Sequence, residues 1–177
     1  MVSGSTRAAS TNTALCRTAA VAAPEGVEVE TYLDVSVLPH FDPDDDREPL
    51  PPAVQQLRDS IAAADVVLFC TPEYAGTLPG SFKNLLDWTV GGTEISAKPV
   101  VWINVAAPGR GHGAIATLET VLGYVSADVL QAGRVELPIA RDLVGADGIV
   151  VEPTVRDGLA GVWTTLAQHL QAPQRTA

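Results

Sequence analysis

Two kinds of apolar pattern alternate along this chain. Uninterrupted apolar runs rich in β-branched residues, such as residues 66–70, predict strands that are buried on both faces of a sheet. Residues 27–33 instead alternate apolar and polar side chains, which predicts a strand near the edge of a sheet. The expected strands, in chain order, are residues 1–2, 27–33, 66–70, 98–105 and 129–137.

Between these strands the apolar residues recur at the spacing of an α-helix. The first helix is expected over residues 12–22, with Leu15 and Ala19 facing inward. Residues 34–52 are irregular and long for a loop in a compact domain. The final residues of the chain are expected to fray. The inward positions of the other helices are expected to be Val54, Leu57 and Ile61; Leu78, Phe82, Leu85 and Leu86; Leu118, Val121, Leu122 and Val125; and Val155, Leu159, Val162, Leu166 and Leu170.

Strands that alternate with helices along the whole chain predict an α/β fold with a parallel sheet covered on both faces. Five such units predict a flavodoxin-like three-layer sandwich with the strand order 2-1-3-4-5 and a shortened first strand. A chain of 177 residues fits a single domain over residues 1–177. In this order the loops after strands 1, 3 and 4 converge at one end of the sheet, where ligands bind in open parallel sheets. These loops are residues 3–12, 72–79 and 106–113.

Charge and composition narrow the possible partners. A formal net charge of -10 argues against nucleic acid or an anionic membrane, because both attract a basic face. A polyanionic ligand must therefore be held by local groups, such as backbone N–H donors and one or two arginines. Neither a leader pattern nor an apolar segment of membrane-spanning length is evident. Cys16 and Cys70 lack CxxC spacing, so no disulfide or zinc site is expected, and a reducing cytoplasm fits best.

The first of the three loops carries groups suited to a phosphate. Hydroxyl, amide and guanidinium groups surround the start of a helix, where unpaired N–H groups and the helix dipole favour an anion. These groups belong to Ser3, Ser5, Arg7, Ser10 and Asn12. The guanidinium of Arg7 can bind two phosphate oxygens at once. Ser10 or Asn12 could also simply cap the helix, and the two roles are compatible.

Spacing argues against several other kinds of site. No G-x-G-x-x-G follows a strand, and no P-loop, nucleophile elbow or H-E-x-x-H is present. The acidic run at residues 42–46 resembles a calcium loop, but Arg47 and Ala53 occupy the places of its glycine and its bidentate Glu. Residues 72–79 fit a ligand platform or a tight connection equally well. No metal is expected, because the histidines are too scattered, and only His112 lies at the predicted site; they are His40, His112 and His169.

Together these motifs resemble the NADPH-dependent FMN reductase family, which includes quinone, azo and chromate reductases. The likeness covers nearly the whole chain in element order. It is carried by Ser3-Gly4-Ser5-Thr6-Arg7 with Ser10 and Asn12, by Thr71-Pro72-Glu73-Tyr74, and by Leu78-Pro79-Gly80 with Lys83-Asn84 and Asp87-Trp88. The resemblance implies an FMN-dependent oxidoreductase that passes a hydride from NADPH or NADH through bound FMN to a flavin, a quinone or a similar acceptor.

The same resemblance implies roles for individual residues. The FMN phosphate would be held by Ser5, Arg7, Ser10 and Asn12, and the isoalloxazine ring would be lined by Pro72, Glu73, Tyr74 and Gly76, largely through backbone groups. The loop after Asn104 would close the other side of the ring. No catalytic side chain is expected, because the flavin carries the chemistry, and alternating substrates would give ping-pong kinetics. Members of the family are commonly dimers or tetramers, with Lys83 and Asp87 as plausible interface partners here.

Two features depart from the family pattern. Ala75 stands where the family usually has Asn, so a side-chain amide near the flavin is absent and FMN is expected to bind less tightly or to be tuned differently. Members begin with a full apolar strand, so we expect the native chain to start upstream of Met1. Two other functions stay open: a flavin-binding electron carrier or redox sensor without turnover, using residues 34–52 for its partner, and a degenerate scaffold.

Overall fold

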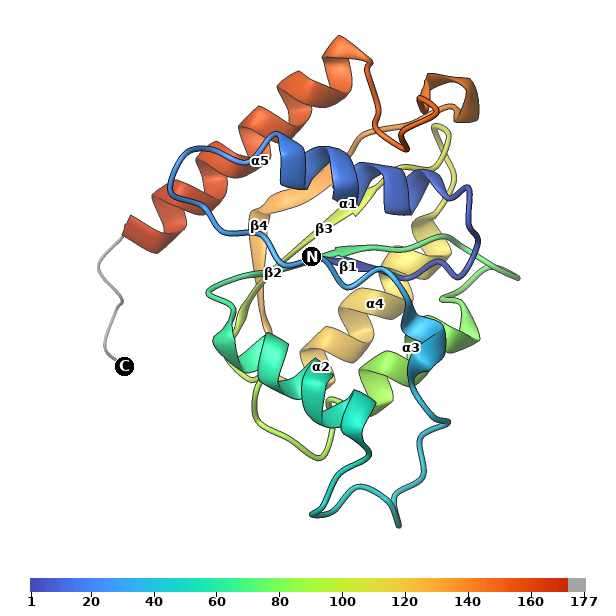
Figure 1. Ribbon diagram of the computed structural model, residues 1–177, viewed down its shortest axis with the longest axis vertical. Helices are drawn as coiled ribbons and strands as arrows, with labels where there is room; N and C mark the ends of the chain where they lie inside the picture. Colours follow the sequence, from blue (N-terminus) through green and yellow to red (C-terminus); the bar gives the residue numbers. More distant parts are fainter. Residues whose placement is uncertain (172–177) are drawn as a thin grey trace.

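The computed structural model describes residues 1–171 and has three layers (Figure 1). In chain order the elements are β1 (Val2–Ser3), α1 (Thr11–Val21), the 3₁₀ helix η1 (Val35–Val37), α2 (Pro52–Ala63), β2 (Val67–Cys70), α3 (Gly80–Asp87), β3 (Pro99–Asn104), α4 (His112–Tyr124), β4 (Asp128–Glu136), the 3₁₀ helix η2 (Arg141–Leu143) and α5 (Pro153–Gln171). Helices α1 and α5 cover one face of the sheet, and α2, α3 and α4 cover the other. The α/β class is therefore confirmed, whereas the predicted fraying of the final residues lies outside the described residues.

Within residues 1–171 the sheet has four parallel strands in the order β1-β2-β3-β4. The prediction of five strands is wrong, and the order 2-1-3-4-5 is not confirmed. Residues 27–33 meet the sheet through a single parallel bridge between Tyr32 and Val2. Two backbone hydrogen bonds accompany this bridge, from Tyr32 N to Met1 O at 2.7 Å and from Ser3 N to Tyr32 O at 2.9 Å. The alternating pattern forms no strand because β1, its neighbour, has only two residues to pair with.

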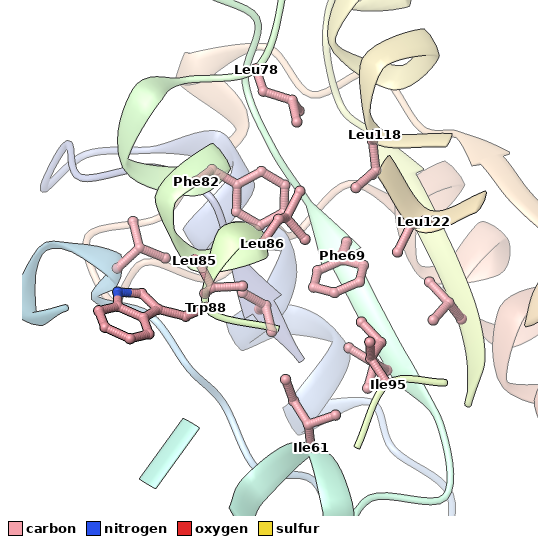
Figure 2. Packing of buried hydrophobic residues seen from close by; sticks show 14 of the residues in the cluster. Ile61, Phe69, Leu78, Phe82, Leu85, Leu86, Trp88, Ile95, Leu118 and Leu122 are labelled. Carbon is pink, nitrogen blue, oxygen red and sulfur yellow. The ribbon is translucent and has the colours of Figure 1, made fainter. Parts of the chain in front are cut away.

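The two central strands are buried on both faces, as their apolar runs predict. Val67 and Phe69 of β2 pack with α2, α3 and α4, whereas Leu68 and Cys70 pack with α1 and α5. Figure 2 shows the first of these clusters, in which the rings of Phe69 and Phe82 meet edge to face with centroids 5.6 Å apart. This packing fixes the strand ends that carry the three loops.

The helices follow the predicted periodicity closely, except that Leu78 precedes α3 and Val125 follows the last residue of α4. Helix α1 begins and ends one residue before the predicted range, and Leu15 and Ala19 are fully buried. An exception is Leu170, which is half exposed, because the core residues contributed by α5 end at Leu166. None of the helices in the described part of the chain combines the length and the apolar character needed to cross a bilayer.

The irregular segment between η1 and α2 is held in place by Asn84 of α3 and by Trp88, which follows the last residue of α3. Nε1 of Trp88 and Nδ2 of Asn84 both donate to the carbonyl oxygen of Pro39, at 2.9 and 2.8 Å. Oδ1 of Asn84 accepts a hydrogen bond from Phe41 N at 2.8 Å, and the Phe41 ring packs edge to face on Trp88. Asn84 and Trp88 therefore have a structural role in this chain, which is to hold the segment against α3.

A buried ion pair holds the same segment from α2. Nη2 of Arg58 lies 2.6 Å from Oδ1 of Asp46, and both side chains are less than a tenth exposed. Nε of Arg58 also donates to the carbonyl oxygen of Trp88 at 2.9 Å. Asp46 belongs to the acidic run at residues 42–46, so one of these carboxylates faces a buried cation instead of solvent.

Candidate active site

The carboxyl ends of β1, β2 and β3 lie side by side and bring three loops together. Ser3 at the end of β1 pairs with Cys70 at the end of β2, and Gly4 N donates to Cys70 O at 2.8 Å. The second loop in turn contacts the start of α4, which follows the third loop. These contacts confirm the predicted convergence of the three loops at one edge of the sheet.

The first loop ends at the N-terminus of α1 and has a defined conformation. Ser10 is the N-cap residue, and its Oγ accepts a hydrogen bond from Thr13 N at 3.4 Å. Ser5 is buried, and its Oγ accepts from Arg7 N at 3.3 Å. The exposed Arg7 side chain folds back so that Nη2 donates to Ala9 O at 2.8 Å. Since the first turn of α1 contains no acidic residue, its unpaired N–H groups create a positive local potential.

Asn12, in the first turn of α1, has its amide oriented by a neighbouring strand. Its Oδ1 accepts the S–H of Cys70, with an S···O distance of 3.2 Å. Burial raises the pKa of the Cys70 thiol well above its usual value, so the thiol stays protonated and acts as a donor. Cys16, the other cysteine, is also free and buried. The side-chain carbonyl oxygen of Asn12 is therefore already hydrogen-bonded within the protein, to Cys70.

Glu73 fastens the second loop to helix α4. Its Oε2 accepts hydrogen bonds from Gly113 N at 2.7 Å and Ala114 N at 3.1 Å. These N–H groups belong to the first turn of α4, whose own N-cap residue, Gly111, provides no side-chain oxygen. Glu73 thus caps α4 from another loop, where its negative charge also complements the helix dipole.

The tip of the second loop is a tight hairpin turn. Tyr74 and Thr77 exchange two backbone hydrogen bonds of 3.0 and 3.1 Å. The central residues Ala75 and Gly76 have φ angles of 51° and 77°, as a type I′ turn requires. A Cβ atom at Gly113 would lie only 2.1 Å from the carbonyl oxygen of Gly76, so glycine at 113 lets α4 approach the turn. The turn and the start of α4 therefore form one rigid wall.

Asn104, buried at the end of β3, organises the third loop. Its Nδ2 donates to Arg110 O at 2.9 Å, and its Oδ1 accepts from Ala106 N at 3.1 Å. Next to this loop, Nε2 of His112 lies 3.2 Å from Oε1 of Glu136, with both side chains largely exposed. His112 therefore sits at the edge of the three-loop region, as its place in the sequence predicts.

The sequence identified some of these residues and missed others. Lys83 and Asp87 pair with each other along α3, as their spacing predicts. The positions predicted for a cofactor lie in the first two loops, apart from Asn12 in the first turn of α1, and they are Ser5, Arg7, Ser10, Asn12, Pro72, Glu73, Tyr74 and Gly76. Sequence reasoning missed the roles of Cys70, Asn104 and Gly113. A polar residue at the end of an apolar strand was a usable signal for Asn104, whereas Cys70 and Gly113 depend on contacts distant in sequence.

Comparison with known proteins gives consistent results. The family model described as NADPH-dependent FMN reductase matches residues 1–151. An NAD(P)H-dependent FMN reductase of Pseudomonas aeruginosa is 32% identical over 177 residues, covering 98% of this chain and 91% of that protein. A quinone reductase of Escherichia coli K12 is 29% identical over 174 residues, covering 95% and 92%. The solved structure of a flavoenzyme NAD(P)H:(acceptor) oxidoreductase from Paracoccus denitrificans superposes with a TM-score of 0.77 at 28% identity, covering 95% and 96%, which supports the flavodoxin-like fold.

Proposed function

This chain belongs to the NADPH-dependent FMN reductase family, and from that premise we propose that it is an FMN-dependent NAD(P)H oxidoreductase. It passes a hydride from NADPH or NADH through bound FMN to a small acceptor such as a free flavin or a quinone. The observation that carries the proposal is the meeting of three loops at the carboxyl ends of β1, β2 and β3, all within the matched residues 1–151. The names of the relatives, an FMN reductase and a quinone reductase, support the same reaction class.

The first loop suits the phosphate of FMN. Ser5, Ser10 and the first-turn N–H groups of α1 supply donors, and Arg7 supplies a cation whose guanidinium can pair with two phosphate oxygens. Asn12 adds a side-chain amide in the same turn. Because the whole chain carries a net charge of -10, a phosphate has to be held by such local donors against the overall field.

The second loop suits the isoalloxazine ring. Backbone groups of Pro72, Glu73, Tyr74 and Gly76 would line it, and the type I′ turn and the Glu73 contact to α4 keep that backbone rigid. When bound, FMN supplies a ring that accepts a hydride and passes on electrons singly or in pairs. We assign the protein's residues only binding and orientation, and no catalytic side chain.

We also infer that the protein is a homodimer or homotetramer. Lys83 and Asp87 lie on an accessible side of α3, with side chains 43% and 31% exposed, which leaves them available to a second subunit. Size-exclusion chromatography with light scattering tests this, and a monomer at all concentrations would contradict it. A single domain over residues 1–177 and a cytoplasmic location stay predictions.

Three measurements test the activity. The purified protein is expected to be yellow, or to bind added FMN, and anaerobic NADPH is expected to bleach the flavin absorbance. Steady-state turnover with a quinone or free FMN should give parallel double-reciprocal lines, because both substrates use one site in turn. Failure to bind FMN would refute the proposal. Flavin reduction without turnover by any acceptor would instead indicate an electron carrier.

A further inference from the structure

We propose that Cys70 is a positioning residue for cofactor binding: its thiol holds the Asn12 amide with the N–H₂ group directed to the phosphate loop. This inference rests on the proposed function, because it concerns the same phosphate site. Cys70 lies on β2 and Asn12 on α1, so the contact joins two elements that are 58 residues apart in sequence. The thiol acts through Asn12 and is assigned no contact with FMN.

The contact is directional because the two ends of an asparagine amide differ. One end is an acceptor and the other carries two donors, and the neighbours decide which end faces which way. Sγ of Cys70 lies 3.2 Å from Oδ1 of Asn12, and Cys70 is fully buried. A protonated thiol is a donor, so it favours the carbonyl end.

The other end of the amide is left for a ligand. Within residues 1–171, Nδ2 of Asn12 donates to no acceptor. Solvent still reaches this nitrogen, because it is not among the fully buried side-chain polar atoms that lack a partner. Asn12 lies in the first turn of α1 and is only 5% exposed as a whole, so little solvent competes for this donor. A phosphate oxygen accepts hydrogen bonds, so an inverted amide would present a carbonyl oxygen to an anion and weaken binding.

Apolar packing alone is the competing explanation for Cys70. The residue belongs to the cluster between the sheet and helices α1 and α5, where any small apolar side chain would fill the space. Valine and threonine separate the two explanations, since they have nearly the same shape and only threonine carries a donor. Any overpacking from the additional methyl group is common to both variants.

The test measures the FMN dissociation constant of the FMN-free protein by quenching of flavin fluorescence. We expect Cys70→Val to weaken FMN binding about two- to tenfold, the range of one hydrogen bond. Cys70→Thr and Cys70→Ser retain a donor and should bind FMN within about twofold of the wild type. Cys16→Ala is the matched control, because it alters the neighbouring thiol without removing the donor to Asn12. Thermal unfolding of each FMN-free variant shows that it is folded.

Two results would overturn the inference: Cys70→Val binding FMN as tightly as the wild type, or Cys70→Thr and Cys70→Ser losing as much affinity as Cys70→Val. A wild-type protein that binds no FMN would instead refute the proposed function. The orientation of the amide can then still be measured from the ¹⁵N-resolved side-chain signal of Asn12. That signal should shift in Cys70→Val and be retained in Cys70→Thr, and an identical signal in both variants would overturn the inference as well.

Discussion

Replacing Ala75 with asparagine is expected to stabilise the protein. Ala75 occupies the first central position of the type I′ turn, with a φ of 51°. A residue with a Cβ atom is sterically disfavoured in this left-handed region, and asparagine and glycine are the residues that such turns prefer. Position 75 is exposed, so a larger side chain meets no neighbour that must move.

The magnitude follows from two opposing terms. A left-handed conformation costs an alanine about 1–2 kcal/mol. Glycine removes this cost but makes the unfolded chain more favourable by about 0.4–1 kcal/mol through its conformational entropy. Near the middle of both ranges, Ala75→Gly should therefore stabilise the protein by about 0.5–1 kcal/mol. Asparagine keeps its Cβ atom but hydrogen-bonds locally in this conformation, and we expect Ala75→Asn to fall in about the same range. In a chain of this length that corresponds to a rise in Tm of about 1–4 °C.

Thermal unfolding of the FMN-free protein is the appropriate measurement, because bound cofactor would itself raise the Tm. Ala75→Ser is the matched control: it adds a polar group at the same atom but has no comparable preference for the left-handed region. The serine variant should stay within about 0.5 kcal/mol of the wild type. A lower Tm for Ala75→Asn, or an equal rise for Ala75→Ser, would refute the turn argument.

The same variants separate two explanations of the asparagine that the family usually has at this position. If its amide contacts the flavin, Ala75→Asn should bind FMN more tightly than Ala75→Gly does. If its role is to stabilise the turn, the two variants should bind FMN with similar affinity.

Three further substitutions test contacts around the site. Glu73→Ala removes the cap of α4 and should lower the free energy of unfolding, measured by denaturant titration, by about 1–2 kcal/mol. Glu73→Gln keeps an acceptor and should lose less stability. Equal losses in the two variants would contradict the capping role. Asp46→Ala leaves Arg58 buried without its partner and should cost about 3 kcal/mol, part of which Asp46→Ala combined with Arg58→Met should restore. A loss close to zero for Asp46→Ala would show that the pair is solvated in solution. Arg7→Lys replaces a fork of donors by a point charge and should weaken FMN binding by about tenfold without changing the Tm of the FMN-free protein; unchanged affinity would place the phosphate elsewhere.

The sequence predicts the central part of the fold because burial there leaves a clear pattern. Strand β2 is apolar at every position, and the helices repeat their apolar residues at helical spacing. The prediction fails at residues 27–33, where alternation is present but the neighbouring strand β1 offers only Val2 and Ser3. A strand needs a partner of sufficient length, and alternation alone does not reveal one.

The candidate site is predictable to the extent that its groups are local. Ser10 caps the helix that follows it, so its role can be read from neighbouring residues. The role of Glu73 cannot, because the N–H groups that it binds lie 40 and 41 residues further along the chain. The same holds for Cys70 and Asn12. Their contact exists only after β2 has packed against α1.

Several residues that shape the site do so from a distance. Glu73 holds the start of α4, Asn104 holds the third loop and Cys70 orients Asn12. Each supplies the partner of a polar group that is partly or fully buried, and an unpaired buried group costs about 1–3 kcal/mol. For a flavin enzyme whose protein contributes binding and orientation, such contacts set the geometry of the cofactor. Substitutions chosen only by contact with FMN would therefore miss residues on which its affinity depends.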